Sequence, residues 1–154
     1  QMQKACPFEL STFEGYCLLT SSFFSAYMTN TEHRLLQAER DKTEDNTIIL
    51  HDFFYKNYDL KIKYDPSDPL KQFVEFDDQI IGSTAEAFGT IYGNGKLMCT
   101  QPVAYDSYYN VCQKFVFLYS TIYVVGKGTV GTYVKILEWI SDEEAEQYKK
   151  EEGL

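Results

Sequence analysis

Hydrophobic and polar residues alternate along much of the chain, which is the pattern of half-buried β-strands. The clearest example is residues 57–65. There Leu60, Ile62 and Tyr64 alternate with two lysines. Residues 31–37 fit either a strand or a helical turn. Other runs rich in β-branched and aromatic residues predict strands over residues 12–29, 47–56, 71–76, 79–92, 96–100, 114–125 and 132–140.

Short turn signals separate these runs. Residues 93–95 read Gly-Asn-Gly, and Asn-Gly is the strongest two-residue hairpin signal. Residues 126–131 match the G-x-G-x-x-G pattern of dinucleotide-binding folds. The residues that follow this motif are strand-like, whereas a dinucleotide fold would open a helix there. We therefore interpret residues 126–131 as a glycine-rich hairpin turn.

The period of the pattern changes after the last strand. Ser141 and Glu144 form a capping box, in which each side chain can bond to the backbone amide of the other residue. Good helix formers follow, and Gly153 stands where a helix would end. The sequence thus predicts a short α-helix over about residues 141–152.

The predicted elements define an all-β fold. Eight to ten strands are expected over about residues 12–140, and no βαβ alternation is present. A meander of this many antiparallel strands must hide its edges, and closure into a barrel does so completely. We predict a single domain, residues 1–154, that forms a closed antiparallel eight-stranded β-barrel with the helix on its outside. A two-sheet sandwich is the alternative.

Charge and hydropathy limit the partners. The net charge is −9 and the pI is about 4.7, which argues against nucleic acid, since phosphate binding requires clustered lysine and arginine. No apolar run approaches the roughly 18 residues of a membrane span. No basic segment precedes an apolar core at the start, so any signal peptide is expected to have been removed.

The cysteines are even in number. Four cysteines allow three disulfide connectivities, and sequence alone does not choose among them. Two disulfides in a secreted protein or another oxidising compartment are favoured over four buried thiols. The chain has no C-x-x-C motif, and neither histidine has a ligand-spaced partner, so no metal site is expected. The disulfide candidates are Cys6, Cys17, Cys99 and Cys112.

Catalytic motifs are scarce, and we assign no catalytic residue. The chain lacks G-x-S-x-G, and no Cys-His or Ser-His pairing is suggested by spacing. Glu86 lies among small and apolar residues. It would be a tuned acid on an inward face, but an outward surface position is favoured.

Aromatic residues are the strongest functional signal. The chain has 13 tyrosines and 11 phenylalanines, enough to line a cavity or to fill the barrel. A tyrosine-rich wall suits a planar or conjugated ligand, which stacks on rings and bonds to hydroxyls. A one-residue slip in register would exchange inside for outside. The candidate ligand-binding residues are Tyr27, Phe53, Tyr55, Phe88, Phe117, Tyr119 and Tyr123.

Both ends of the chain resemble the lipocalins. Residues 9–22 are similar to that family's first-strand block, with Phe13 and Gly15 in place of the Phe and Gly of F-x-G-x-W-Y, while Cys17 replaces the Trp. Residues 133–154 resemble its last strand and C-terminal helix. The resemblance implies a secreted eight-stranded barrel of the calycin type that carries a small hydrophobic ligand.

A second, weaker resemblance concerns the middle of the chain. Residues 80–90 and 115–128 look like the core of the dirigent and allene oxide cyclase barrels. That resemblance implies a metal-free cavity that guides a cyclisation or coupling.

We therefore expect a carrier of a small hydrophobic or conjugated molecule. A binding protein is favoured over an enzyme. No cofactor is expected other than a bound hydrophobic ligand or pigment. The alternatives are a barrel enzyme and a filled barrel that acts as a structural or interaction subunit. The oligomeric state is left open.

Overall fold

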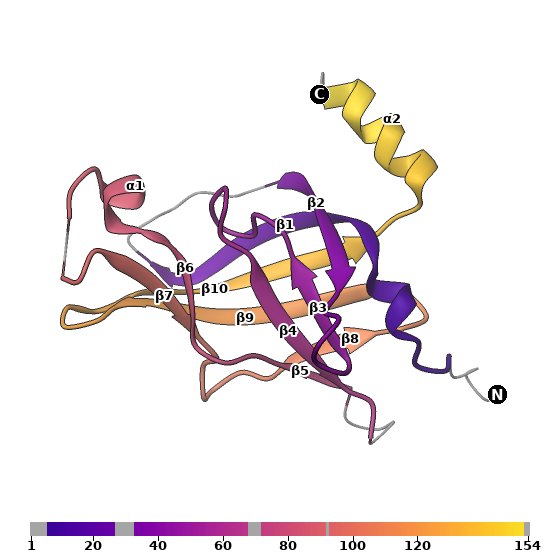
Figure 1. Cartoon of the computed structure of the whole chain (residues 1–154), viewed down its shortest axis with the longest axis horizontal. Coiled ribbons are helices and arrows are strands. Elements are labelled where there is room, and N and C mark those ends of the chain that lie inside the picture. Colours follow the sequence, from indigo (N-terminus) through magenta and orange to yellow (C-terminus); the bar gives the residue numbers. More distant parts are fainter. Residues whose placement is uncertain (1–5, 27–32, 68–71, 92, 153–154) are drawn as a thin grey trace.

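The computed structural model describes residues 6–26, 33–67, 72–91 and 93–152 (Figure 1). Its elements, in chain order, are the 3₁₀-helix η1 (Leu10–Phe13), β1 (Gly15–Ala26), β2 (His33–Arg40), β3 (Thr47–Leu50), β4 (Leu60–Asp65), β5 (Phe73–Glu75), β6 (Gln79–Ser83), α1 (Thr84–Phe88), β7 (Lys96–Thr100), β8 (Ser107–Asn110), β9 (Phe115–Val124), β10 (Gly128–Trp139) and α2 (Asp142–Glu152).

Eight strands form a closed antiparallel barrel in the order β10-β1-β2-β3-β4-β5-β8-β9, and β9 pairs with β10 to close it. The predicted fold class is therefore confirmed. The first half of β9 pairs with β8 and its second half with β7. The hairpin of β6 and β7 thus extends the wall beyond the eight barrel strands.

Two glutamine side chains link the β6–β7 hairpin to the barrel strands, Gln79 to β4 and Gln101 to the residue after β5. The Gln79 amide donates to the Lys61 carbonyl at 2.8 Å, and its oxygen accepts from the Lys61 N–H at 2.9 Å. It therefore replaces a peptide group of a neighbouring strand. In the same way, Gln101 Oε1 accepts from the Phe76 N–H at 3.0 Å.

The end of the barrel nearest η1 is filled with aromatic rings. The Phe13 ring lies 4.5 Å from Tyr64, 5.8 Å from Tyr109 and 5.2 Å from Trp139, measured between centroids. All four side chains are at most 5% exposed. We call this half of the barrel the proximal half, and the half beyond it, toward the β9–β10 turn, the distal half.

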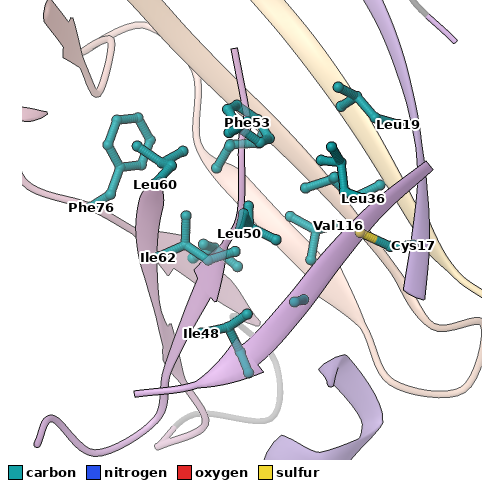
Figure 2. Close-up of a cluster of buried hydrophobic side chains, with 14 of the residues drawn as sticks. Cys17, Leu19, Leu36, Ile48, Leu50, Phe53, Leu60, Ile62, Phe76 and Val116 are labelled. Atoms are coloured by element: carbon teal, nitrogen blue, oxygen red, sulfur yellow. The ribbon is translucent and has the colours of Figure 1, made fainter. Parts of the chain in front are cut away.

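Aliphatic side chains from successive strands continue the core (Figure 2). Leu36, Leu50 and Leu60 come from β2, β3 and β4 and are all buried in one cluster with Phe53. These strands form because their sequences alternate, as in β4, where every second residue is buried.

One disulfide is present rather than the two predicted. Cys6 and Cys112 are bonded, which ties the segment before η1 to the β8–β9 turn, whereas Cys17 and Cys99 are buried and form no disulfide. Through the strand register Cys99 is level with Ala26, nine residues along β1 from Cys17 (26 − 17 = 9). That is roughly 30 Å at the rise of a strand, far beyond disulfide reach.

Other local predictions change in the structure. The strand predicted over residues 79–92 stops at Ser83, because this residue caps α1: its hydroxyl accepts from the Glu86 N–H at 3.2 Å and donates to the Glu86 carboxylate at 3.0 Å. The strand predicted over residues 47–56 ends at Leu50. The segment 102–110, for which no strand was predicted, contains β8.

The C-terminal predictions are confirmed. The hairpin turn between β9 and β10 covers residues 125–127; residues 128–131 already belong to β10, so the glycine-rich motif opens no helix. The Ser141 and Glu144 capping box is formed, with both bonds at 3.1 Å. The helix α2 lies outside the barrel beside β1 (Figure 1), where Lys149 donates to the Tyr16 hydroxyl at 3.1 Å.

Candidate functional site

Three polar side chains interrupt the apolar inner surface of β9 and β10. Alternate residues of a strand share one face. On β10 the buried inward residues are Tyr133, Lys135, Leu137 and Trp139, each at most 5% exposed. The inward residues of β9 include Ser120, which is fully buried. We call Ser120, Tyr133 and Lys135 the polar cluster.

The strand register brings the polar cluster together. Ser120 and Tyr133 are direct partners across the β9–β10 ladder. Directly opposite residues on one face have Cβ atoms about 5 Å apart. Lys135 is the next inward residue on β10 and lies opposite Leu118. The cluster therefore occupies one continuous spot at mid-height on the inner wall.

Two hydroxyls of the polar cluster are buried and unpaired. Ser120 Oγ and Tyr133 Oη have no hydrogen-bond partner among the described residues. Burial raises the pKa of the Tyr133 hydroxyl, and nearby Tyr55 raises it further, so this group is a neutral donor at physiological pH. Such hydroxyls are uncommon, because each costs about 1–3 kcal/mol in lost hydration.

The Lys135 ammonium lies among aromatic rings. Its Nζ is 4.6 Å from the centre of the Phe54 ring and 5.7 Å from the centre of the Tyr133 ring. The residue is only 5% exposed. The negative faces of aromatic rings attract a cation.

The ring that faces Lys135 comes from the opposite wall. Residues 51–59, which we call the β3–β4 loop, cross the distal half of the barrel interior. Phe53 is fully buried and packs edge-on against Phe54 at 4.7 Å. Tyr55 lies against Gly82 of β6, so closely that a Cβ on Gly82 would stand 2.5 Å from the ring. The loop thus covers the polar cluster.

Local hydrogen bonds give the β3–β4 loop its shape. Asp52 and Asn57 adopt left-handed backbone conformations, with φ of 52° and 74°. Asp52 Oδ1 accepts from the Asn57 N–H at 2.7 Å, and the Phe53 N–H donates to the Tyr58 carbonyl at 3.1 Å. These contacts fold a sequence of strand-forming residues into a compact loop.

His51 ties the start of this loop to β2 and to the loop's last residue. Its Nε2 lies 2.9 Å from Glu39 of β2, and its Nδ1 lies 3.2 Å from Asp59, which precedes β4. Partial burial of the ring works against protonation, but the two carboxylates outweigh it and raise the pKa of His51. The charged imidazolium therefore strengthens the base of the loop.

The residues predicted to bind a ligand do not form one site. Phe53 and Tyr55 lie in the β3–β4 loop and reach the barrel interior. Phe88 lies in α1 and is 39% exposed. Tyr27 lies outside the described residues. The remaining three, Phe117, Tyr119 and Tyr123, lie on the outer face of β9, because the inward, buried residues of this strand are the alternate ones.

The outer rings of β9 make contacts on the barrel surface. Phe117 stacks on Tyr108 at 5.1 Å, and Tyr119 stacks on Tyr105 at 5.2 Å. The Tyr123 hydroxyl donates to Asp78 at 2.7 Å. That bond and a second one from Thr100 lower the pKa of Asp78.

Sequence reasoning missed all three members of the polar cluster. A signal was available for Lys135, which shares its strand face with three large hydrophobic or aromatic residues of β10. Ser120 similarly interrupts an aliphatic face of β9. A polar residue within the inward series of a barrel strand is the pattern that would have indicated them.

A surface groove of about 660 Å³ lies over the seam between β4 and β6. Two of the charged residues that line it have structural partners. Lys61 pairs with Asp41 at 2.9 Å, and Asp78 accepts from Thr100 and Tyr123. Among the described residues no group of three or more His, Cys, Asp or Glu side chains is placed to hold a metal ion.

The disulfide is consistent with an oxidising compartment. In the described part of the chain, no helix has the length and apolar character needed to cross a membrane.

No curated protein and no solved structure matches the sequence. A family model does match, over residues 1–151, and the chain belongs to that family, the domain of unknown function DUF4984.

Proposed function

We propose that this protein binds a small, largely apolar molecule in the distal half of its barrel, between the β3–β4 loop and the wall of β9 and β10. The observation that carries the proposal is the pair of buried, unpaired hydroxyls of Ser120 and Tyr133 beside a buried lysine. Ligand sites combine mostly apolar walls with a few convergent polar groups, which is the composition of this region.

The two halves of the barrel differ in a way that supports this placement. The proximal half is occupied by the packed rings of Phe13, Tyr64, Tyr109 and Trp139. The distal half is covered by the β3–β4 loop, whose Phe54 and Tyr55 side chains are only half-buried. We infer that these side chains move aside when the ligand enters. The protein acts as a carrier, in a secreted setting to which the disulfide is suited.

The test compares an inward and an outward change on the same strand. Ser120→Met places a longer side chain inside the barrel, and Thr121→Met places the same side chain on the outer face. The neutral fluorophore N-phenyl-1-naphthylamine serves as the probe. Ser120→Met is expected to weaken its binding by at least about tenfold, whereas Thr121→Met changes the dissociation constant by less than about threefold.

Circular dichroism verifies that both variants fold. The proposal is wrong if the wild-type protein binds no probe and native mass spectrometry of protein from its natural source shows only the polypeptide mass. An added mass of roughly a few hundred daltons, the size of a pocket ligand, supports it.

A second candidate function is an interaction subunit that uses its outer aromatic surface. Phe73, Tyr108 and Phe117 are neighbours across β5, β8 and β9, and the first two are 40% and 36% exposed. Aromatic residues are enriched at protein interfaces. This reading predicts association that is lost when Phe73 and Tyr108 are both changed to serine, with binding of N-phenyl-1-naphthylamine unaltered.

A further inference from the structure

We propose that the protein docks on a lipid surface with anionic headgroups through the distal end of its barrel. We call this end the distal tip, and it consists of the described residues of segments 84–97 and 124–131. The inference goes beyond the proposed function and is independent of it, because it concerns the outer surface and not the polar cluster.

The two segments of the distal tip lie against each other. A Cβ on Gly93 would stand 2.6 Å from Cγ1 of Val124 and 3.0 Å from Cγ of Lys127, so the turn after α1 contacts the β9–β10 turn. The Thr84 N–H donates to the Gly95 carbonyl at 3.1 Å and closes the base of the turn after α1. Both turns lie at the left end of the molecule in Figure 1, away from α2.

Large apolar side chains are exposed on the distal tip. Ile91 is 77% exposed, Val125 is 50% exposed and Phe88 is 39% exposed. They come from the turn after α1, the β9–β10 turn and α1, so separate segments bring them to one end of the barrel. Exposed apolar surface of this kind marks a site of contact with a membrane or with another protein.

A groove of about 480 Å³ at the distal tip is lined in part by Phe88. Two further lining residues link it to the interior, because Val124 belongs to the core and Val130 packs against the core. The groove therefore offers an acyl chain an apolar surface that is continuous with the core. This feature suits a lipid layer, whose chains are mobile enough to enter a narrow groove.

The charges of the distal tip favour anionic headgroups. Among the described residues of its two segments, Lys96 and Lys127 are basic and Glu86 alone is acidic, whereas the whole chain has a net charge of −9. The Glu86 carboxylate accepts a hydrogen bond from the Ser83 hydroxyl at 3.0 Å. Lysines beside exposed apolar side chains are typical of proteins that bind at the surface of anionic membranes.

The strongly acidic helix α2 lies far from the distal tip. It contains six acidic residues and two lysines. The strand β10 runs from the tip toward α2, and Gly128 and Trp139 at its ends are roughly 36 Å apart at the rise of a strand. Salt screens interactions between exposed charges over about 8 Å at physiological ionic strength. A lipid surface at the tip therefore attracts the two lysines without appreciable repulsion from α2, and the molecule docks end-on.

Tryptophan reporters locate the contact. The chain has one tryptophan, Trp139, which is 5% exposed in the proximal half and provides a constant background. Ile91→Trp adds a reporter on the distal tip, and Val103→Trp adds one at a fully exposed position between β7 and β8. Both proteins are titrated with vesicles of phosphatidylcholine, alone or mixed with the anionic lipid phosphatidylglycerol.

We expect the mixed vesicles to shift the emission of Ile91→Trp to the blue and to leave the emission of Val103→Trp unchanged, because only the tip enters the lipid. Binding to the neutral vesicles should be about tenfold weaker than binding to the mixed vesicles.

Two matched pairs of variants test the residues themselves by co-sedimentation with mixed vesicles. Ile91→Asp should bind at least about tenfold more weakly than the wild-type protein, whereas Val103→Asp stays within about threefold of it. Circular dichroism verifies that both variants fold.

The second pair keeps the test available if Ile91→Asp does not fold. Lys96→Gln combined with Lys127→Gln should weaken binding by about tenfold. Lys42→Gln combined with Lys63→Gln changes the net charge equally at exposed positions outside the tip and should stay within about threefold of the wild-type protein.

Three outcomes overturn the proposal. The first is that the wild-type protein does not sediment with mixed vesicles, and the second is that Ile91→Asp binds them as tightly as the wild-type protein. The third is a wild-type dimer, measured without vesicles by analytical ultracentrifugation, that Ile91→Asp abolishes, because the tip would then bind a second copy of the chain. Equal binding to neutral and mixed vesicles overturns the assignment of anionic headgroups. The proposed function is tested separately by N-phenyl-1-naphthylamine in the absence of vesicles.

Discussion

Two buried serines show how the same side chain serves different purposes in this barrel. Ser107 on β8 is 1% exposed, and its hydroxyl accepts from the Tyr119 N–H at 2.9 Å. Ser120 on β9 is equally buried, but its hydroxyl has no partner among the described residues. The first serine stabilises the fold. The second one costs stability unless something else binds to it.

Ser107→Ala is therefore expected to destabilise the protein by about 1–3 kcal/mol, because it leaves the Tyr119 N–H buried and unsatisfied. Ser120→Ala in the ligand-free protein is expected to be neutral or to stabilise by up to about 1 kcal/mol, since it removes an unsatisfied group. Urea unfolding of the two variants measures both changes. A loss of stability in Ser120→Ala equal to that in Ser107→Ala would contradict this reading.

The sequence did not indicate which residues of β9 face the barrel interior and which face outward. Both faces of this strand are apolar: Val116, Leu118 and Ile122 face the core, whereas Phe117 and Tyr119 lie outside under neighbouring rings. Alternation distinguishes the two faces only when one of them is polar. The aromatic face was therefore a natural but unreliable guide to the interior.

Among the secondary-structure elements, those specified by a few adjacent residues were predicted correctly from the sequence. The β9–β10 hairpin and α2 were predicted because glycines and a capping box specify them within a few residues. The four-residue strand β8 was missed, because it depends on pairing with β5 and β9, which lie elsewhere in the sequence. The β3–β4 loop was mistaken for a strand, because Phe53, Phe54 and Tyr55 have high β-propensity.

The contact between this loop and β6 makes Gly82 a sensitive position. An added Cβ would meet the Tyr55 ring at 2.5 Å, so the ring must shift. We expect Gly82→Ala to destabilise the protein by about 1–3 kcal/mol through overpacking. Adding Tyr55→Ser should recover part of that loss, because it removes the ring. Thermal or chemical unfolding of the single and double variants measures the coupling, and strictly additive effects would argue against the contact.

The base of the same loop should respond to pH through His51. Its pKa is raised in the folded protein by Glu39 and Asp59. A raised pKa stabilises the fold below the unfolded-state pKa of about 6.5, and this contribution is lost as the pH rises through the folded-state value. The stability difference between wild type and His51→Asn should thus be larger at about pH 5.5 than at about pH 8.5.

Unfolding curves at the two pH values measure this difference, and the imidazole resonances report the pKa directly. Glu39→Gln provides the control, because it removes one carboxylate and should lower the His51 pKa. A His51 pKa at or below the ordinary value of about 6.5 would contradict the arrangement.

For the whole molecule, the Cys6–Cys112 disulfide encloses most of the chain, with a sequence separation of 106 residues. Replacing both cysteines by serine should cost about 2–5 kcal/mol, because the unfolded chain regains the freedom that the bond removes.

Cys17 and Cys99 should resist thiol reagents in the native state, since both are buried and burial raises the pKa of Cys99 to about 12. Thiol counting before and after denaturation tests this, and rapid labelling of two thiols in the native protein would contradict it.

The closed shape of the barrel could be predicted from its number of strands, but the seam between β4 and β6 could not. Gln79 acts there as a substitute for backbone, as Gln101 does beside Phe76 after β5, and no local pattern distinguishes such glutamines from surface ones. The Gln79 contact also affects how two molecules of this protein can associate. With the Lys61 N–H and carbonyl already occupied by an amide side chain, the exposed border of β4 offers no free ladder to the strand of another chain. We therefore expect Gln79 to disfavour edge-to-edge pairing between molecules at this part of β4, the contact from which fibrillar self-assembly can begin.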